Sequence, residues 1–256
     1  MKILGYSERG AMNALFYGMN FNAKGEEQMR KFLELAKIDA PDSFSHFEIY
    51  NEFSLSEFGN PDLVIIAQNK EKKKYVFFVE SKVSNGTSYN IDDQKEKHEK
   101  DLKDYKDNNN CHNKGDASNL FFQLRLKHFF FEQRETIIEP VGGPNEKTEI
   151  DHACIENTKG RNGEIRLRKL GSNPIVIKFA EKIKECIDAY YIAIVPKQER
   201  ENPVDYSLDS SETKTMRIYF VSWEDIFKED LGQLKDTFEF NKNGNVSLIL
   251  NNPKTK

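Results

Sequence analysis

Residues 59–82 have the sequence GNPDLVIIAQNKEKKKYVFFVESK, and this stretch decides the fold. Two apolar runs, 62–68 and 75–83, flank the polar segment 69–73. This pattern predicts two strands joined by a hairpin turn. The second run is apolar at both odd and even positions up to Glu80, which indicates a central strand covered on both faces. We therefore expect adjacent antiparallel strands within a single α/β sheet.

The register of this hairpin brings two carboxylates together. If the turn is centred on Glu71, paired residues have numbers that sum to 142. Asp62 then lies opposite Glu80 at one end of the hairpin, with Cβ atoms about 5 Å apart. Like charges at this spacing destabilise a sheet unless a positive charge lies between them. Carboxylate oxygens are ligands of Mg²⁺ and Mn²⁺, so the register predicts a divalent metal site at Asp62 and Glu80.

Two further charged residues belong to this candidate site. Lys82 follows Glu80 by two positions on the same strand face, within reach of a phosphate or an attacking water. Glu8 precedes Met12 by four residues, so it falls on the core-facing side of the first expected helix. A glutamate in a first turn also stabilises its own helix through the dipole, and both roles stay open for Glu8. The alternative for the hairpin is a chance meeting of surface charges, since 31% of the chain is charged.

The rest of the chain shows no internal repeat and no clear linker, which favours one domain over residues 1–256. Residues 135–173 are polar and are expected to form an insertion. Residue periodicity and capping residues such as Ser118 predict the other elements. The expected helices span 7–20, 26–37, 118–132, 174–189 and 223–231, and the expected strands span 46–53, 190–195, 217–221, 238–240 and 246–250.

The motif Pro61-Asp62, followed after seventeen residues by Glu80-Ser81-Lys82, resembles the PD-(D/E)XK nuclease superfamily. The segment 7–16 is similar to the first helix of its bacterial members, which often supplies an acid, here Glu8. The resemblance covers roughly residues 5–132 and, less clearly, 190–222. It implies a restriction endonuclease-like fold, in which a mixed central sheet is flanked by helices.

The resemblance also implies a chemistry, the hydrolysis of phosphodiester bonds with Mg²⁺, for which Mn²⁺ substitutes. Asp62 and Glu80 are then metal ligands, and the Ser81 carbonyl and Glu8 complete the coordination. Lys82 orients the nucleophile or stabilises the transition state. In the helix expected over 118–132, Gln123 takes the place of a polar residue that lines the site, and Lys127 lies one turn further on the same face. Both are expected to contact nucleic acid.

Substrate binding needs positive charge, although the net charge of the chain is −4. Residues 159–169 contain five basic residues and one acid, so Arg166 and Arg168 are expected to contact phosphates from a basic hairpin. The alternative is an ordinary solvated hairpin. The three cysteines are far apart, which gives no sign of a disulfide framework or a zinc ribbon. The sequence shows no apolar run of membrane-spanning length and no secretory signal, and a cytoplasmic location is expected.

Three functions remain open at this point. The first is an endonuclease that cuts duplex DNA in restriction, defence or repair. The second is a nuclease for branched or single-stranded DNA or for RNA. The third is a nucleic-acid-binding module that has kept the fold without turnover. A homodimer would suit the cutting of two strands, and a partner chain in a defence or repair system would supply any motor, because this chain has no P-loop.

Overall fold

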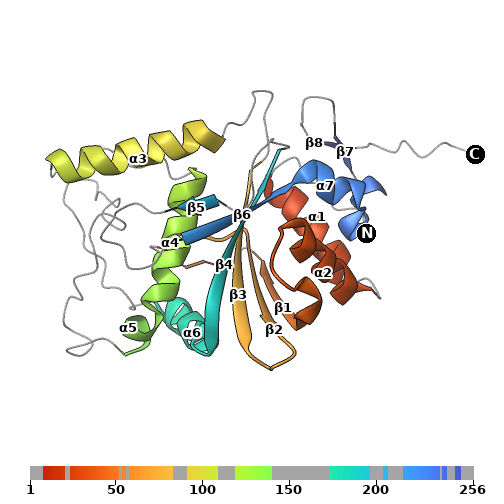
Figure 1. Ribbon diagram of the computed structural model, residues 1–256, viewed down its shortest axis with the longest axis horizontal. Helices are drawn as coiled ribbons and strands as arrows, with labels where there is room; N and C mark the ends of the chain where they lie inside the picture. Colours follow the sequence, from red (N-terminus) through yellow and green to blue (C-terminus); the bar gives the residue numbers. More distant parts are fainter. Residues whose placement is uncertain are drawn as a thin grey trace, which may run out of the picture.

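A six-stranded mixed sheet lies at the centre of the molecule (Figure 1). The computed structural model describes residues 8–20, 24–51, 54–55, 58–82, 91–108, 119–139, 173–196, 204–206, 216–236, 238–240 and 246–248. The strands of the sheet are β1 (Ser45–Asn51), β2 (Leu63–Gln68), β3 (Lys74–Ser81), β4 (Cys186–Val195), β5 (Val204–Tyr206) and β6 (Met216–Ser222). Their order is β1-β2-β3-β4-β6-β5. Strands β3, β4 and β6 are mutually parallel, and the other neighbouring pairs are antiparallel.

Helices cover both faces of this sheet, as expected for the α/β class (Figure 1). One layer contains α1 (Glu8–Asn20), α2 (Gly25–Leu35), α7 (Trp223–Lys228) and the 3₁₀ helices η1 (Pro41–Ser43) and η4 (Leu231–Asp236). The other layer contains α3 (Ile91–Asn108), α4 (Leu120–Glu132), α5 (Arg134–Ile138) and α6 (Pro174–Ile183). A separate antiparallel hairpin of β7 (Phe238–Phe240) and β8 (Val246–Leu248) confirms the predicted terminal hairpin.

Strand β3 separates the two halves of the core. Its odd-numbered Phe77 and Val79 pack with the α1 and α2 layer, where Leu15 is fully buried. Its even-numbered Val76 and Phe78 pack with the α4 layer. Alternation of side chains across the pleat therefore gives each layer its own face of the strand. The prediction of a central strand covered on both sides is confirmed.

The predicted register of the β2–β3 hairpin is also confirmed. Val64 pairs with Phe78 and Ile66 pairs with Val76, so the numbers of paired residues sum to 142. The Asn69 side chain fixes the turn, because its Oδ1 accepts hydrogen bonds from the backbone N–H groups of Glu71 (3.0 Å) and Lys73 (2.9 Å). A one-residue slip would turn every side chain of the strand to the other face.

The largest boundary differences from the sequence prediction lie between α6 and β4. The helix expected over 174–189 ends at Ile183, and β4 begins at Cys186 rather than at Tyr190. The first residues of β4 are extended because they pair in parallel with β3, where Cys186 lies beside Lys74. These two residues are distant in sequence, so local periodicity does not report their pairing. The N-cap of α4 is Asn119 rather than Ser118, since the Asn119 side chain accepts from the backbone N–H groups of Phe121 and Phe122.

Within the described ranges, no helix combines the length and the apolar character that crossing a lipid bilayer requires. Helix α5 and strand β5 are short elements that the sequence prediction did not include. Helix α5 lies at the start of the predicted polar insertion 135–173, and the insertion from 140 to 172 lies outside the described residues.

Candidate active site

The hairpin register predicts Asp62 opposite Glu80; the ladder ends at Leu63 and Val79, and the Asp62 carboxylate contacts Ser81, the residue after Glu80. Asp62 immediately precedes β2, whose first residue, Leu63, pairs with Val79. The Asp62 Oδ2 atom accepts hydrogen bonds from the backbone N–H of Ser81 at 2.7 Å and from the Ser81 hydroxyl at 3.0 Å. Two donors from one residue fix the orientation of the Asp62 carboxylate toward β3. Charge-assisted bonds of this kind are roughly twice as strong as neutral ones.

The backbone N–H and C=O groups of Ser81 project toward β2, where Asp62 lies. In an extended strand the N–H and C=O groups of one residue project to the same side. Because the Ser81 N–H points to Asp62, the Ser81 carbonyl projects to the β2 side as well. Ser81 is fully buried. Its carbonyl is therefore oriented as the predicted metal-ligand role requires.

The side chain of Glu80 is buried on the face of β3 that packs against α4. Helix α1 packs on the other face. The Glu80 side chain is 1% exposed, and its Oε1 atom lies 2.8 Å from the Nζ atom of Lys127, which is 0% exposed. Neither Glu80 oxygen makes a hydrogen bond with a residue that the structure describes, so Oε1 has only this ion pair and Oε2 has no donor. A buried carboxylate oxygen without a donor costs free energy, so Oε2 is an available ligand atom.

The charges around Glu80 set its protonation. Burial raises the pKa of Glu80 to about 7. The Lys127 ammonium opposes this rise, the Asp62 carboxylate adds to it, and Lys82 opposes it more weakly. Asp62, Lys82 and Lys127 are therefore all close enough to Glu80 to affect its charge. A carboxyl group with a pKa near neutrality can exchange a proton under ordinary conditions.

Lys82 directly follows β3, and its backbone is held on two sides. Its N–H donates to the carbonyl of Ile194 in β4 at 2.8 Å. Its carbonyl accepts from the indole Nε1–H of Trp223 in α7 at 3.0 Å. Lys82 is 9% exposed. The backbone at this position is thus fixed between a strand and a helix, which limits where the ammonium group can lie.

Lys127 reaches Glu80 because α4 presents one buried stripe to the sheet. Leu120, Leu124 and Phe131 lie on this stripe, and Lys127 has the spacing of a core residue within it. Gly59, which has a φ of +77°, lies beside the Lys127 ammonium. A Cβ atom at Gly59 would be 2.9 Å from the Lys127 Nζ, so the glycine leaves room for the ammonium group.

Gln123 lies one turn before Lys127 on the same face of α4. It is partly buried, and its Oε1 atom is buried without a hydrogen-bond partner among the residues described. From the sequence, both Gln123 and Lys127 are expected to contact nucleic acid. The structure places Lys127 against Glu80 instead of at an exposed surface. The spacing of Lys127 from the buried leucines of α4 signals its burial in the sequence, but it does not identify Glu80 as its partner.

Three other predicted site residues cannot be placed. Glu8 begins α1, but its side chain lies outside the described residues. Helix α1 itself packs on the face of β3 opposite to Glu80. Arg166 and Arg168 also lie outside the described residues. The roles predicted for these three residues stay predictions.

The two carboxylates have a donor arrangement that fits a divalent cation. Asp62 has one oxygen held by Ser81, and Glu80 has one oxygen held by Lys127. Glu80 Oε2 has no donor among the described residues and is left for a ligand. No group of three or more His, Cys, Asp or Glu side chains suited to a metal occurs among the described residues. Further ligands would have to be backbone oxygens, water or residues outside that set.

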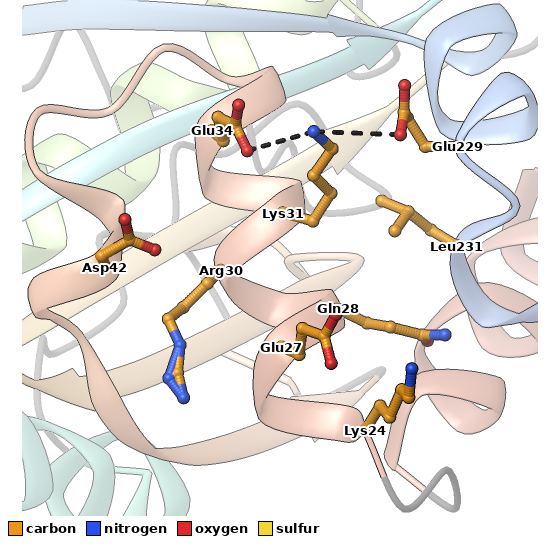
Figure 2. Close-up of a pocket in the computed structure, with 9 residues that line it drawn as sticks. All are labelled: Lys24, Glu27, Gln28, Arg30, Lys31, Glu34, Asp42, Glu229 and Leu231. Atoms are coloured by element: carbon orange, nitrogen blue, oxygen red, sulfur yellow. Dashed lines mark ion pairs between the residues drawn. The ribbon is translucent and has the colours of Figure 1, made fainter.

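A groove of about 530 Å³ lies elsewhere, on the outer side of α2 (Figure 2). It is lined by Lys24, Glu27, Gln28, Arg30, Lys31, Glu34, Asp42, Glu229 and Leu231. Lys31 lies between Glu34 at 3.2 Å and Glu229 at 3.8 Å, and these side chains are substantially exposed. Exposed pairs of this kind contribute little free energy. The groove belongs to the helical layer opposite to α4, so we assign the chemistry to the buried site rather than to this groove.

Comparison of the chain with known protein families, with curated proteins and with solved structures found no significant match. The geometry at the end of the β2–β3 hairpin is therefore the guide to function. Two adjacent carboxylates and two lysines meet there, and three of these four side chains are at most 9% exposed.

Proposed function

We propose that this chain is a metal-dependent nuclease with a restriction endonuclease-like fold. The proposal is carried by one observation, the meeting of Asp62 with the Glu80-Ser81-Lys82 segment at the end of the hairpin. Buried charges are costly unless they are paired or bind a metal, so a fold has little reason to collect them here except for function.

In this proposal Asp62, Glu80 and the Ser81 carbonyl hold Mg²⁺ or Mn²⁺. When bound, the metal supplies Lewis-acid chemistry at the phosphate and activates water near neutral pH. Ser81 orients Asp62 through its two donors. Glu80 contributes Oε2, which lacks a hydrogen bond within the described residues. Lys82 contributes a positive charge near the attacked phosphate, with its backbone fixed by Ile194 and Trp223.

The substrate that we propose first is duplex DNA, with restriction, defence or repair as the setting. Arg166 and Arg168 are the proposed phosphate-binding residues. Branched DNA, single-stranded DNA and RNA are the competing substrates. They differ from duplex DNA in groove shape and base accessibility rather than in the bond that is cut. The site chemistry is therefore common to all of them.

The test is a cleavage panel of duplex, single-stranded and branched DNA and of RNA, with Mg²⁺, with Mn²⁺ and with a chelator. We expect metal-dependent cleavage of at least one substrate. Asp62→Ala should abolish it, because this variant removes a ligand. The control is Asp42→Ala, which removes an exposed acid on the opposite layer and should leave cleavage unchanged. If the wild type cleaves nothing but binds nucleic acid, the chain is a binding module and the proposal fails.

A further inference from the structure

Lys127 is the most deeply buried charged side chain of the site, and the nuclease chemistry described above does not use it. It is 0% exposed, and its Nζ lies 2.8 Å from Glu80 Oε1. Gly59 also lies close to the ammonium, since a Cβ atom built on it would come within 2.9 Å of Nζ. An ammonium group enclosed in this way is too deep to meet a nucleic acid from outside. Its function must therefore act through Glu80.

The charges of the site balance in the absence of metal. Two carboxylates, Asp62 and Glu80, are matched by the two ammonium groups of Lys82 and Lys127. A divalent cation at the carboxylates would add two positive charges beside these two ammonium groups. Like charges within a few ångströms repel strongly in a buried site, where screening is weak. The ion and the nearer ammonium therefore compete for the same carboxylate.

We propose that Lys127 is a displaceable counter-ion, which neutralises Glu80 in the metal-free protein and is repelled when a divalent cation binds. The inference rests on the proposed function, because it requires Glu80 to be a metal ligand. Lys127 is a positioning residue in this scheme. It orients Glu80 and favours its charged form while the metal is absent, and it weakens the affinity for the metal in return.

Lys127 fits this role better than Lys82. The Lys127 ammonium makes the ion pair with Glu80, and burial keeps it away from solvent. Lys82 follows Glu80 on the strand and acts on it more weakly than Lys127 does. A consequence is that the site assembles without metal, since the protein provides its own cation.

The first test is calorimetric titration with Mn²⁺ at a pH above about 7, the pKa to which burial raises Glu80. Lys127→Met removes the competing charge, and Lys127→Gln removes it while keeping an N–H donor for Glu80. Both variants should bind Mn²⁺ at least about tenfold more tightly than the wild type, because the repulsion is gone. If Lys127→Met does not fold, Lys127→Gln decides the question. Lys178→Met is the control, since it removes an exposed lysine of α6 and should keep the wild-type affinity.

The second test measures the Glu80–Lys127 pair without metal. Urea unfolding in a chelator is compared for Glu80→Gln, Lys127→Met and the double variant. The double variant should lose less stability than the two single variants together, because the second removal takes away a charge already left unpaired. This readout does not depend on metal binding or on cleavage.

The outcomes distinguish the counter-ion role from the proposed function. Mn²⁺ affinities of Lys127→Met and Lys127→Gln that are equal to or weaker than wild type overturn the counter-ion role. So do additive effects in the unfolding cycle. If neither the wild type nor any variant binds Mn²⁺, the proposed metal site is wrong, and so is the proposed displacement of Lys127 by a metal. If the unfolding cycle still shows strong coupling between Glu80 and Lys127, the pair contributes to stability only.

Discussion

At the scale of single residues, Glu80 gives the protein a measurable dependence on pH. Its ordinary pKa is 4.5, and burial raises it to about 7 in the folded state. Between these values the folded protein holds a proton that the unfolded chain has released. The contribution of Glu80 to stability is therefore complete below pH 4.5 and is lost as the pH rises to about 7.

The prediction compares the wild type with Glu80→Gln in a chelator, by urea unfolding at several pH values. Between pH 4.5 and about 7, the wild type should lose about 3 kcal/mol relative to the variant, since one pKa unit corresponds to about 1.4 kcal/mol. Glu185→Gln is the control. The pKa of Glu185 is lowered by its exposed bond to Lys74, so its small effect has the opposite sign. A wild-type curve parallel to that of Glu80→Gln would contradict the prediction.

The effect of a Lys82 substitution on cleavage distinguishes a nuclease from a protein that only binds metal. An ammonium group is not a metal ligand, so Lys82→Ala should fold and bind Mn²⁺. Cleavage should nevertheless slow by about 10²–10³-fold, because a positive group near the transition-state charge is removed. The measurement is single-turnover cleavage at saturating Mn²⁺. Equal rates for Lys82→Ala and the wild type would remove Lys82 from the mechanism.

At the scale of elements, the N-terminus of α4 determines where Lys127 lies. Asn119 is 2% exposed and caps the helix, and its Nδ2 also donates to the carbonyl of Gln94 in α3 at 2.7 Å. Helix α6 has a similar cap, Asn173, whose Oδ1 accepts from the N–H of Ile175 at 2.9 Å. Both caps are asparagines, but Asn119 is buried and also bonds to Gln94, so Asn173 serves as the comparison for Asn119.

Asn119→Ala should cost about 2 kcal/mol of the free energy of unfolding, and Asn173→Ala should cost about 1 kcal/mol. The larger loss follows from the buried position of Asn119 and its additional bond to α3. Chemical denaturation of both variants at one pH gives the comparison. Equal losses would mean that the link between α3 and α4 contributes nothing to stability.

At the scale of the whole molecule, a chain with a net charge of −4 must concentrate its positive charge to bind a polyanion. The basic segment 159–169 is the predicted place. Neutralising Arg166 and Arg168 should weaken binding to every nucleic acid sequence and reduce the salt slope by about one for each phosphate that is no longer neutralised. Binding is measured at several salt concentrations with Ca²⁺ in place of Mg²⁺. An unchanged affinity and slope would mean that this segment is only solvated.

Much of the fold follows from local patterns in the sequence. Apolar residues at both odd and even positions of β3 predict its central position, and the polar turn predicts the pairing of Val64 with Phe78. That register in turn predicts that Asp62 lies beside the end of β3. Met12, on the predicted core-facing side of α1, is buried as expected. Each of these features depends on residues that are near one another in the chain.

Interactions between distant segments could not be predicted in the same way. The ion pair of Glu80 with Lys127 depends on how α4 crosses β3, and the early start of β4 at Cys186 depends on parallel pairing with β3. A helical face shows which residues are buried but not which strand they meet. For this reason the sequence suggests a substrate-binding role for Lys127, although its spacing from Leu120 and Leu124 places it on the buried side.

The indole of Trp223 makes the site visible by fluorescence. Trp223 is the single tryptophan of the chain, is 1% exposed, and donates to the carbonyl of Lys82. Selective excitation of indole therefore reports one position, bonded to a residue that lies two places after Glu80 in the chain. A cation at the proposed Asp62 and Glu80 site would change the electric field at that ring and at the carbonyl to which it is bonded. The emission of the native protein is thus an optical probe of this end of the sheet, which needs no label and no substrate.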